Sequence, residues 1–508
     1  MARLDPSRQP VIVGIGEIID RPADRAAGQE PLALWAEALR RADADAGGTM
    51  LARLDSLDLV NSITWPYADP VGLLSARLGV APARQFYGEV GGNTPILFIH
   101  EAAQRIAGGE GVVAAVVGGE ATHTATWARR QGIELPWTKV EPVAMAPGGY
   151  LPARRRSYLH PLAQVHDIQA PITVYPLYEN ATAKAWGLTP AAAHQESARI
   201  WAGMSAVAAA NPNAWMKTAL TPAQIATTSP DNRAIAYPYP KLIVANPAVN
   251  QGGAVLITNA ATARAAGIAE SQLIYIWGGA AATEPKDWME RDQFTSAPAQ
   301  DVVLEAMLAS LGGSTGGLAA CELYSCFPVV PKMARRRLGL AEDAALSTAG
   351  GLTFHGAPLN NYMTHAACGM VRTLRARPGE RGLLYGQGGF VTAHHAITVA
   401  ARPADDDAIL APFDLQGQAD ARRGPAPTIV ENYGGSAEVE TFTVVFAQDG
   451  GVAHGAVVLR LPDGARSLAR VLADDTRTLA ILMDPAASPI GRAGKVTTGG
   501  DGLLHWAA

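Results

Sequence analysis

Residues 347–362 read STAGGLTFHGAPLNNY. The pattern predicts a strand that runs into the Gly350–Gly351 pair, followed by a turn through His355 and a helix that starts near Asn360. Such a turn gathers backbone N–H groups and polar side chains at a buried edge of a sheet. On its own this stretch predicts only a turn. Three further stretches give it meaning: VGGNTPILFIHEAAQRI from residue 90, CELYSCFPV from residue 321 and GLLYGQGGFVTAHH from residue 382.

The composition indicates a soluble protein with several domains. A chain of 508 residues with 48% hydrophobic content can form two to four domains with large cores. A net charge of −5 without a long basic run makes nucleic acid a poor partner. The opening MARLDPSRQP lacks the apolar core of a signal peptide, and no 18-residue apolar stretch predicts a membrane span. Three cysteines without CxxC spacing cannot form a disulfide framework, so we expect a cytoplasmic protein.

Strand and helix patterns alternate over residues 1–122 and resume over residues 241–270. This alternation predicts a mainly parallel sheet covered on both faces. The expected strands are residues 11–19, 54–61, 85–90, 112–117, 241–244 and 254–258, and the expected helices are residues 31–44, 71–78 and the segment from about 94.

The rest of the chain divides into four further segments. Residues 123–240 are rich in Pro, Trp, Tyr and Arg and predict a loop domain that acts as a lid or a binding subdomain. Residues 271–402 repeat the earlier order of glycine pair, helix, polar link, apolar strand and glycine pair, which indicates an internal duplication. Residues 403–427 predict a linker, and the hairpin patterns of residues 428–508 predict a small β-barrel or sheet.

These stretches resemble the thiolase superfamily over residues 11–402. YPLYENATAKAWGLTP, NPNAWMKTALTPAQI and SPDNRAIAYPYPKL follow the order of the loop region in its sterol-carrier-protein-2-type branch, and VANPAVNQGGAVLITN is similar to the stretch before its fifth N-terminal strand. The last segment resembles the extra domain of thiolase-like proteins type 1, often catalogued as acetyl-CoA acetyltransferases. The resemblance implies an α/β thiolase fold: duplicated βαβαβαββ halves in five αβαβα layers, with an inserted loop domain and a barrel-like C-terminal domain.

The resemblance also implies where catalytic groups should lie, and four of them are absent. The family's nucleophilic Cys falls at Gly92, its Asn or His at Tyr324, its second His at Ala357 and its second Cys at Gly386. Acyl transfer through a cysteine therefore has no obvious nucleophile. The backbone N–H groups of Gly92 and Gly388 fall where the family builds an oxyanion hole, which needs backbone geometry rather than side chains.

Four side chains near these stretches are candidates for a rebuilt site. A phenol at Tyr324 exchanges a proton with a β-oxygen, as implied by relatives that cleave C–C bonds by retro-aldol chemistry, or makes a structural hydrogen bond. Cys326 is a nucleophile or inert packing. His355 is a substitute proton carrier or a satisfied core histidine. Of His394 and His395, strand alternation lets only one face the cleft, and we expect His394.

The resemblance implies coenzyme A as the substrate or product thioester, bound near Val244 and Ala248. The arginine runs at 154–156 and 335–337 are solvated faces, or one of them contacts the 3′-phosphate of coenzyme A. No pair of histidines has a zinc spacing, so no metal is expected. The glycine pairs do not form GxGxxG after the first strand, which argues against dinucleotide binding.

Two classes of function remain open. The first is a thiolase-like acyl-CoA-processing enzyme that makes or breaks a C–C bond without the cysteine nucleophile. The second is a non-catalytic CoA-ester-binding or scaffolding protein whose C-terminal domain holds a protein partner. Convergence of Tyr324 and His355 on one pocket would favour the enzyme. Thiolases dimerise through their core sheets, and an extra domain could cover that surface, so we expect a monomer or a homodimer.

Overall fold

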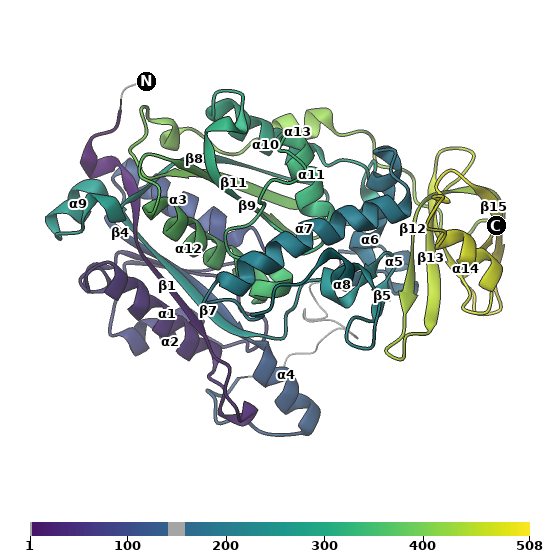
Figure 1. The fold of residues 1–508 in the computed structure, drawn as a ribbon, viewed down its shortest axis with the longest axis horizontal. Coiled ribbons are helices and arrows are strands. Elements are labelled where there is room, and N and C mark those ends of the chain that lie inside the picture. The colour runs from purple at the N-terminus through teal and green to yellow at the C-terminus, as the bar shows by residue number, and fades with distance from the viewer. Residues whose placement is uncertain (1–2, 141–157) are drawn as a thin grey trace.

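The computed structural model describes residues 3–140 and 158–508 (Figure 1). Its centre is a nine-stranded sheet with the order β3-β2-β4-β7-β1-β8-β11-β10-β9. The strands of the first half are β1 (Pro10–Ile19), β2 (Ser56–Leu59), β3 (Arg84–Tyr87), β4 (Val113–Ala121) and β7 (Asn250–Asn259). Those of the second half are β8 (Ile274–Thr283), β9 (Leu318–Leu323), β10 (Arg381–Gly388) and β11 (Ala393–Ala400).

The two halves of the sheet have related topologies. In each half one strand, β7 or β11, runs antiparallel to both of its neighbours. The pairs β2–β3, β2–β4 and β9–β10 are parallel and the other five pairs are antiparallel, so the expectation of a mainly parallel sheet holds only at the two edges. The halves join where Val11 pairs with Tyr275 and Ile12 pairs with Ile274.

The two halves of the sheet form two layers of the molecule, and helices form the other three. On the outer side of the first half, α1 (Pro31–Asp45) packs on β1, β4 and β7, and α2 (Pro70–Leu78) packs on α1. On the outer side of the second half, α10 (Pro298–Ser310) packs on β8 and β11, and α11 (Val329–Arg337) packs on β9. Between the halves, α3 (Thr94–Gly108) and α12 (Tyr362–Arg375) contact strands of both. The layer order is therefore αβαβα.

Local sequence explains why the two middle helices lie where they do. Pro95 sits in the first turn of α3, where its missing N–H costs nothing, and Gly109 ends the helix with a left-handed φ of 82°. Almost every residue of α12 is buried, as expected for a helix with sheet on both sides. Both glycine-pair turns therefore lead into helices of the central layer.

The inserted region lies over one end of the sheet. It contains α4 (Thr122–Gln131), α5 (Pro161–Val165), α6 (Pro171–Ala185), α7 (Pro190–Ala210), α8 (Pro222–Ala226), β5 (Ala234–Ala236) and β6 (Tyr239–Pro240). The expected strand at residues 241–244 is wrong. Lys241–Ile243 forms a 3₁₀ turn instead, because Pro240 ends the pairing and has no N–H to continue it. The arginine run at 154–156 lies outside the described residues.

The strand expected before Gly350 is also wrong. Residues 351–355 form a single π-helical turn, and Gly350, Gly351 and Gly356 have φ values of 113°, 73° and 109°. Ahead of that turn, Ser347, Thr348 and Ala349 donate to the Glu322 carboxylate and not to the backbone of a neighbouring strand. Glycine accommodates the positive φ angles of the turn itself without strain. A Cβ at position 350 would lie 2.6 Å from Ala208 Cα, so this turn packs directly against α7.

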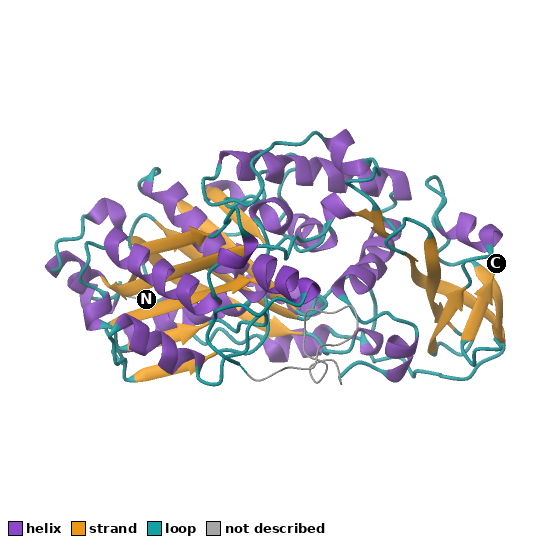
Figure 2. Ribbon diagram, turned by 90° about the horizontal axis from the view of Figure 1, so that it is seen from below, coloured by secondary structure: helices purple, strands orange, loops and turns teal. Residues whose placement is uncertain are grey.

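The C-terminal residues form a closed five-stranded barrel, seen at one end of the molecule in Figure 2. Its strands are β12 (Gly435–Phe446), β13 (Val452–Arg460), β14 (Arg466–Val471), β15 (Ala493–Thr498) and β16 (Leu504–Ala507), and its helix is α14 (Thr476–Leu482). The order β12-β13-β14-β16-β15 closes through the pairing of β15 with β12. With β14 parallel to β16 and α14 between β14 and β15, this is an OB-type barrel.

The barrel is firmly attached to the rest of the molecule. Val445 of β12 pairs with Ala236 of β5, so the barrel wall continues into the inserted region. Within the expected linker, α13 (Gln416–Arg422) packs on α10, and Arg423 forms a 2.7 Å ion pair with the buried Glu284. Across residues 3–140 and 158–508, no helix is both long enough and apolar enough to cross a membrane.

Candidate functional site

Gly92 lies in the turn between β3 and α3, opposite Tyr324 at the end of β9. A Cβ at position 92 would stand 2.2 Å from the Tyr324 hydroxyl oxygen and 2.5 Å from the carbonyl oxygen of Gln387. No side chain fits there without a shift of the backbone or of the tyrosine ring. The Tyr324 hydroxyl occupies the place from which a side chain at position 92 would start.

Gly388 closes the same turn from the second half. A Cβ at position 388 would stand 2.4 Å from Asn93 Oδ1 and 3.2 Å from the Gly92 nitrogen. At Gly386, a Cβ would lie 3.1 Å from Asn93 Cα. The structure therefore brings Gly92 and Gly388 together through backbone approaches that only glycine permits. The position of the second family cysteine is crowded as well.

Polar groups line the next layer behind this turn. The Tyr175 hydroxyl, from α6, donates to the Gly389 carbonyl at 2.6 Å and lies 2.9 Å from Gln387 Oε1. Cys326 Sγ lies 3.7 Å from the same Gln387 oxygen. Burial raises the pKa of the Cys326 thiol to about 12 and raises the pKa values of Tyr324 and Tyr175 well above their usual range. At neutral pH these groups are a thiol and two phenols, so they can donate hydrogen bonds but are poor nucleophiles and bases.

His355 faces away from Tyr324. The ring of Tyr362 contacts both edge-on, with centroid distances of 6.1 Å to Tyr324 and 5.7 Å to His355. His355 Nε2 instead lies 3.6 Å from Glu17 Oε1, and the His355 ring lies 4.9 Å from that of His365. The two expected partners do not share a hydrogen-bonding position.

His394 lies in a separate buried chain of polar groups. Its Nδ1 is 2.7 Å from the Tyr385 hydroxyl, which accepts a 2.7 Å hydrogen bond from Gln300 Nε2. Its Nε2 is 3.2 Å from the Val391 carbonyl oxygen. Burial lowers the pKa of His394 to about 3, so the ring is neutral. Its neighbour His395 contacts His100 at 2.9 Å. Both histidines have core partners.

A buried carboxylate holds the start of the 347–355 turn. Glu322 of β9 accepts hydrogen bonds from the Ser347 hydroxyl, the Thr348 and Ala349 amides and, at 2.7 Å, the Tyr362 hydroxyl. Burial raises the pKa of Glu322, while these donors oppose the rise. The side chain acts on the site indirectly, because it fixes the ring of Tyr362 that backs Tyr324.

The expected coenzyme A contacts lie on a loop beside this turn. The Ala245 amide donates to the Cys326 carbonyl, and the Asn246 amide donates to the Leu352 carbonyl. Val244 is buried and its carbonyl accepts a hydrogen bond from Thr353, whereas Ala248 is exposed. The loop therefore connects the interior of the site with the surface.

The arginines at 335–337 are all engaged with carboxylates. Arg335 and Arg336 bind Glu196, Arg336 also covers the Trp186 ring at 3.8 Å, and Arg337 pairs with Asp301 and Glu305. These contacts account for the charge of the run without an external phosphate. They favour the structural interpretation of the run.

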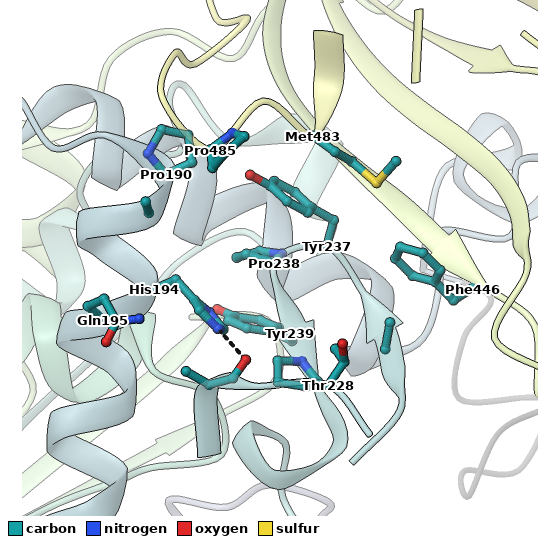
Figure 3. A pocket seen from close by; sticks show the side chains of 14 residues that line it. Pro190, His194, Gln195, Thr228, Tyr237, Pro238, Tyr239, Phe446, Met483 and Pro485 are labelled. Atoms are coloured by element: carbon teal, nitrogen blue, oxygen red, sulfur yellow. Dashed lines mark hydrogen bonds between the residues drawn. The ribbon is translucent and has the colours of Figure 1, made fainter. Parts of the chain in front are cut away.

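A hollow of about 350 Å³ lies between the inserted region and the barrel (Figure 3). Tyr237, Tyr239 and His194 line it from the inserted region, and Phe446 and Met483 line it from the barrel. His194 Nε2 is already 3.0 Å from the Ala226 carbonyl oxygen. The hollow is mainly apolar.

Comparison with solved structures agrees with this architecture. A monomeric SCP2-thiolase-like protein type 1 from Mycobacterium smegmatis is 28% identical, with 99% of each chain covered and a TM-score of 0.80. Residues 414–501 match the family described as "thiolase-like protein type 1 additional C-terminal domain". The chain therefore shares the thiolase fold and the additional C-terminal domain of thiolase-like proteins type 1. This thiolase-like protein matches no curated protein.

More distant structures share the fold of the thiolase-like body. The Ltp2-ChsH2(DUF35) aldolase is 18% identical, covers 79% of this chain and 99% of its own, and has a TM-score of 0.59. Human mitochondrial 3-ketoacyl-CoA thiolase, in a structure with CoA, is 14% identical, covers 78% of this chain and 99% of its own, and has a TM-score of 0.57. At these identities the likeness extends to the fold alone.

Several residues of the site were not anticipated from the sequence. Tyr175, Gln387 and Glu322 reach the site from three different elements, and only Gln387 lies in a glycine-rich motif. Glu17 was the most visible signal, because a carboxylate within the apolar run VIVGIGEII needs a partner if that run is a buried strand.

Proposed function

We propose that this thiolase-like protein binds a coenzyme A thioester at the Gly92–Gly388 turn and forms no covalent acyl-enzyme at residue 92. The observation that carries the proposal is the Tyr324 hydroxyl, which stands 2.2 Å from the place a Cβ of residue 92 would take. A nucleophilic side chain is thus excluded at that position by its surroundings as well as by the residue type.

Recognition of the thioester rests on backbone donors and on the phenol. The Gly92 and Gly388 amides suit a carbonyl oxygen, and the protonated Tyr324 hydroxyl supplies one more donor beside them. The loop with Val244 and Ala248 runs from this turn to the surface, where Ala248 is exposed. The human thiolase with the same fold was solved with CoA, which supports the choice of ligand class.

A second candidate is catalysis of C–C bond cleavage or formation on the bound thioester. The position of Tyr324 favours it, because a neutral phenol can donate a proton to a β-oxygen as a bond breaks. His355 gives this candidate no support, since its ring contacts Tyr362 and its Nε2 faces Glu17. Binding without turnover is therefore the function we put first.

One experiment separates the alternatives. The purified protein is titrated by calorimetry with coenzyme A and with β-keto and β-hydroxy acyl-CoAs, and the mixtures are analysed by mass spectrometry for cleaved or condensed products. We expect saturable binding that weakens about tenfold in Tyr324→Phe, as loss of one hydrogen bond predicts. Tyr275→Phe is the matched control, since the Tyr275 hydroxyl contacts Glu270 and Arg264.

The outcomes differ clearly between the candidates. Products that disappear in Tyr324→Phe but persist in Tyr275→Phe would establish the enzyme. Binding without products supports the binder. Absence of binding to every CoA compound would overturn the proposal.

A further inference from the structure

Glu17, His355 and His365 meet at the end of the 347–355 turn that lies farthest from Glu322. They come from β1, the π-helical turn and α12, and one ligand atom from each lies within 4.8 Å of the others. Glu17 Oε1 is 2.7 Å from His365 Nδ1 and 3.6 Å from His355 Nε2. All three side chains are at most 1% exposed.

The imidazole nitrogens of this cluster are only partly satisfied by the protein, because His365 Nδ1 alone has a partner, Glu17. Neither ring nitrogen of His355 has a hydrogen-bond partner, and His365 Nε2 has none. Buried polar atoms of folded proteins are almost always paired, so orphaned nitrogens beside a carboxylate indicate a missing partner.

We propose that Glu17, His355 and His365 bind a first-row divalent metal ion, with zinc as the best match. Two imidazoles and one carboxylate are a common ligand set for Zn²⁺. Ligand bonds of about 2.0–2.2 Å place the ligand atoms of a tetrahedral site about 3.3–3.6 Å apart. The Glu17–His355 separation already has this value, and the Glu17–His365 separation lengthens when the ion replaces the proton between them. That proton is released to solvent.

The surroundings hold the three ligands in place. Glu17 Oε2 is bound by Arg372 at 2.6 Å and by Asn213 at 3.1 Å, which leaves Oε1 to the imidazoles. A Cβ at Gly253 would lie 3.2 Å from the His365 ring, so the glycine lets that ring rest against β7. Hydrogen-bond and packing partners of this kind orient the side chains that bind a metal directly.

The site is distinct from the proposed thioester site. The rings of His355 and Tyr324 contact Tyr362 rather than each other, so the ion stabilises the turn that backs Tyr324 and does not touch the thioester. No short zinc-binding motif marks these residues, because Glu17 lies far along the chain from His355 and His365. This inference does not depend on CoA binding.

Metal content and cobalt spectra test the inference in the full-length protein. We expect the protein, freed of metal by a chelator and dialysed, to bind one equivalent of Zn²⁺ by calorimetry, and one of Co²⁺ with visible absorption bands of a low-coordinate site. His355→Gln and His365→Gln should each weaken Co²⁺ binding at least about 100-fold. His100→Gln removes a buried histidine of a different pair and should bind as the unmodified protein does.

A second measurement guards against variants that fail to fold. Crystals of the unmodified protein grown with zinc should give anomalous scattering between Glu17, His355 and His365. An ion placed elsewhere, no stoichiometric binding, or unchanged binding in a folded His355→Gln variant would overturn the inference. Since these measurements use no thioester, their failure leaves the proposed function standing.

Discussion

The glycine turns of the two halves have been closed in different ways. At Gly92 in the first half, the space is filled by packing: Tyr324 and Gln387 from the second half reach over the turn. At residues 347–355 in the second half, the turn is held by charge, with Glu322 at its start and Glu17 at its end. At the packed turn, an added side-chain atom at residue 92 would clash with its neighbours. The stability of the charged turn depends on whether its carboxylates keep their partners.

The two carboxylates also differ from each other. Burial pushes the pKa of Glu17 upward, but His355, His365 and the Arg372 guanidinium outweigh burial and hold this pKa well below its usual range. Glu322 has only neutral donors, and burial raises its pKa. The end of the turn is thus an ionic cluster and its start is a hydrogen-bonded one.

Removing the acceptor at the start of the turn should have the largest effect. Glu322→Ala leaves the Ser347 and Tyr362 hydroxyls and two backbone amides without their buried acceptor. We expect the free energy of unfolding to fall by about 3–5 kcal/mol, measured by urea denaturation. Glu322→Gln keeps an acceptor and should lose less. Equal losses in both variants would mean that the charge, rather than the acceptor, holds the turn.

The contributions of the two carboxylates to stability should change in opposite directions with pH. Glu17 has a lowered pKa, so its stabilisation is complete above the ordinary value of 4.5 and is lost as pH falls below it. Glu322 has a raised pKa, so its contribution is greatest at or below pH 4.5 and declines as pH rises. Each pKa unit corresponds to about 1.4 kcal/mol.

Denaturation of two variants over pH 4–8 measures this difference. The penalty of Glu17→Gln should be constant once pH is well above 4.5 and should shrink as pH falls through 4.5, whereas that of Glu322→Gln should shrink as pH rises above 4.5. Parallel pH profiles of the two penalties would show that the two ends of the turn are not electrostatically distinct.

A single added atom should destabilise the packed turn at Gly92. Gly92→Ala places a Cβ against the Tyr324 hydroxyl and should cost about 1–3 kcal/mol in urea denaturation. Adding Tyr324→Ala removes the hydroxyl but leaves the Gln387 carbonyl oxygen, 2.5 Å from the Cβ position, so only part of the Gly92→Ala penalty should disappear and the two penalties should be less than additive. Gly111→Ala is the control, because a Cβ there meets no atom within 4 Å. Full additivity would contradict the packing account.

The smallest effect should come from the thiol beside the turn. With a pKa of about 12, buried Cys326 carries almost no thiolate at pH 8, and Cys321 and Cys368 are buried too. Iodoacetamide should leave the native protein essentially unlabelled while it labels all three cysteines of the unfolded chain, as counted by mass spectrometry. Rapid labelling of Cys326 in the native protein would restore it as a candidate nucleophile.

Much of the fold could be predicted because its signals are local. Apolar runs and helical spacings placed most strands and helices of both halves, and the hairpin patterns after residue 428 predicted the barrel. The errors at residues 241–244 and before Gly350 fall where Pro240 or positive φ angles override an apolar pattern. Local backbone conformation determines the structure of those segments.

The site could be predicted only in part because its contacts are long-range. The approach of Gly92, Tyr324 and Gly388 followed from motif order in a known fold. The pairing of His355 with Glu17 and the chain from Gln300 to His394 depend on which way each side chain turns once the layers have assembled. No spacing along the chain encodes those directions.

The pairing of β12 with β5 has a consequence for how the barrel and the body stay together. Two separate subunits would need high affinity to remain associated in dilute solution. On one chain, the barrel and the inserted region meet in a fixed one-to-one ratio at a high effective concentration, set by the short connection that includes α13. Individually weak contacts, such as one strand pair and a few hydrogen bonds, are then enough to keep the hollow between them assembled for the lifetime of the protein.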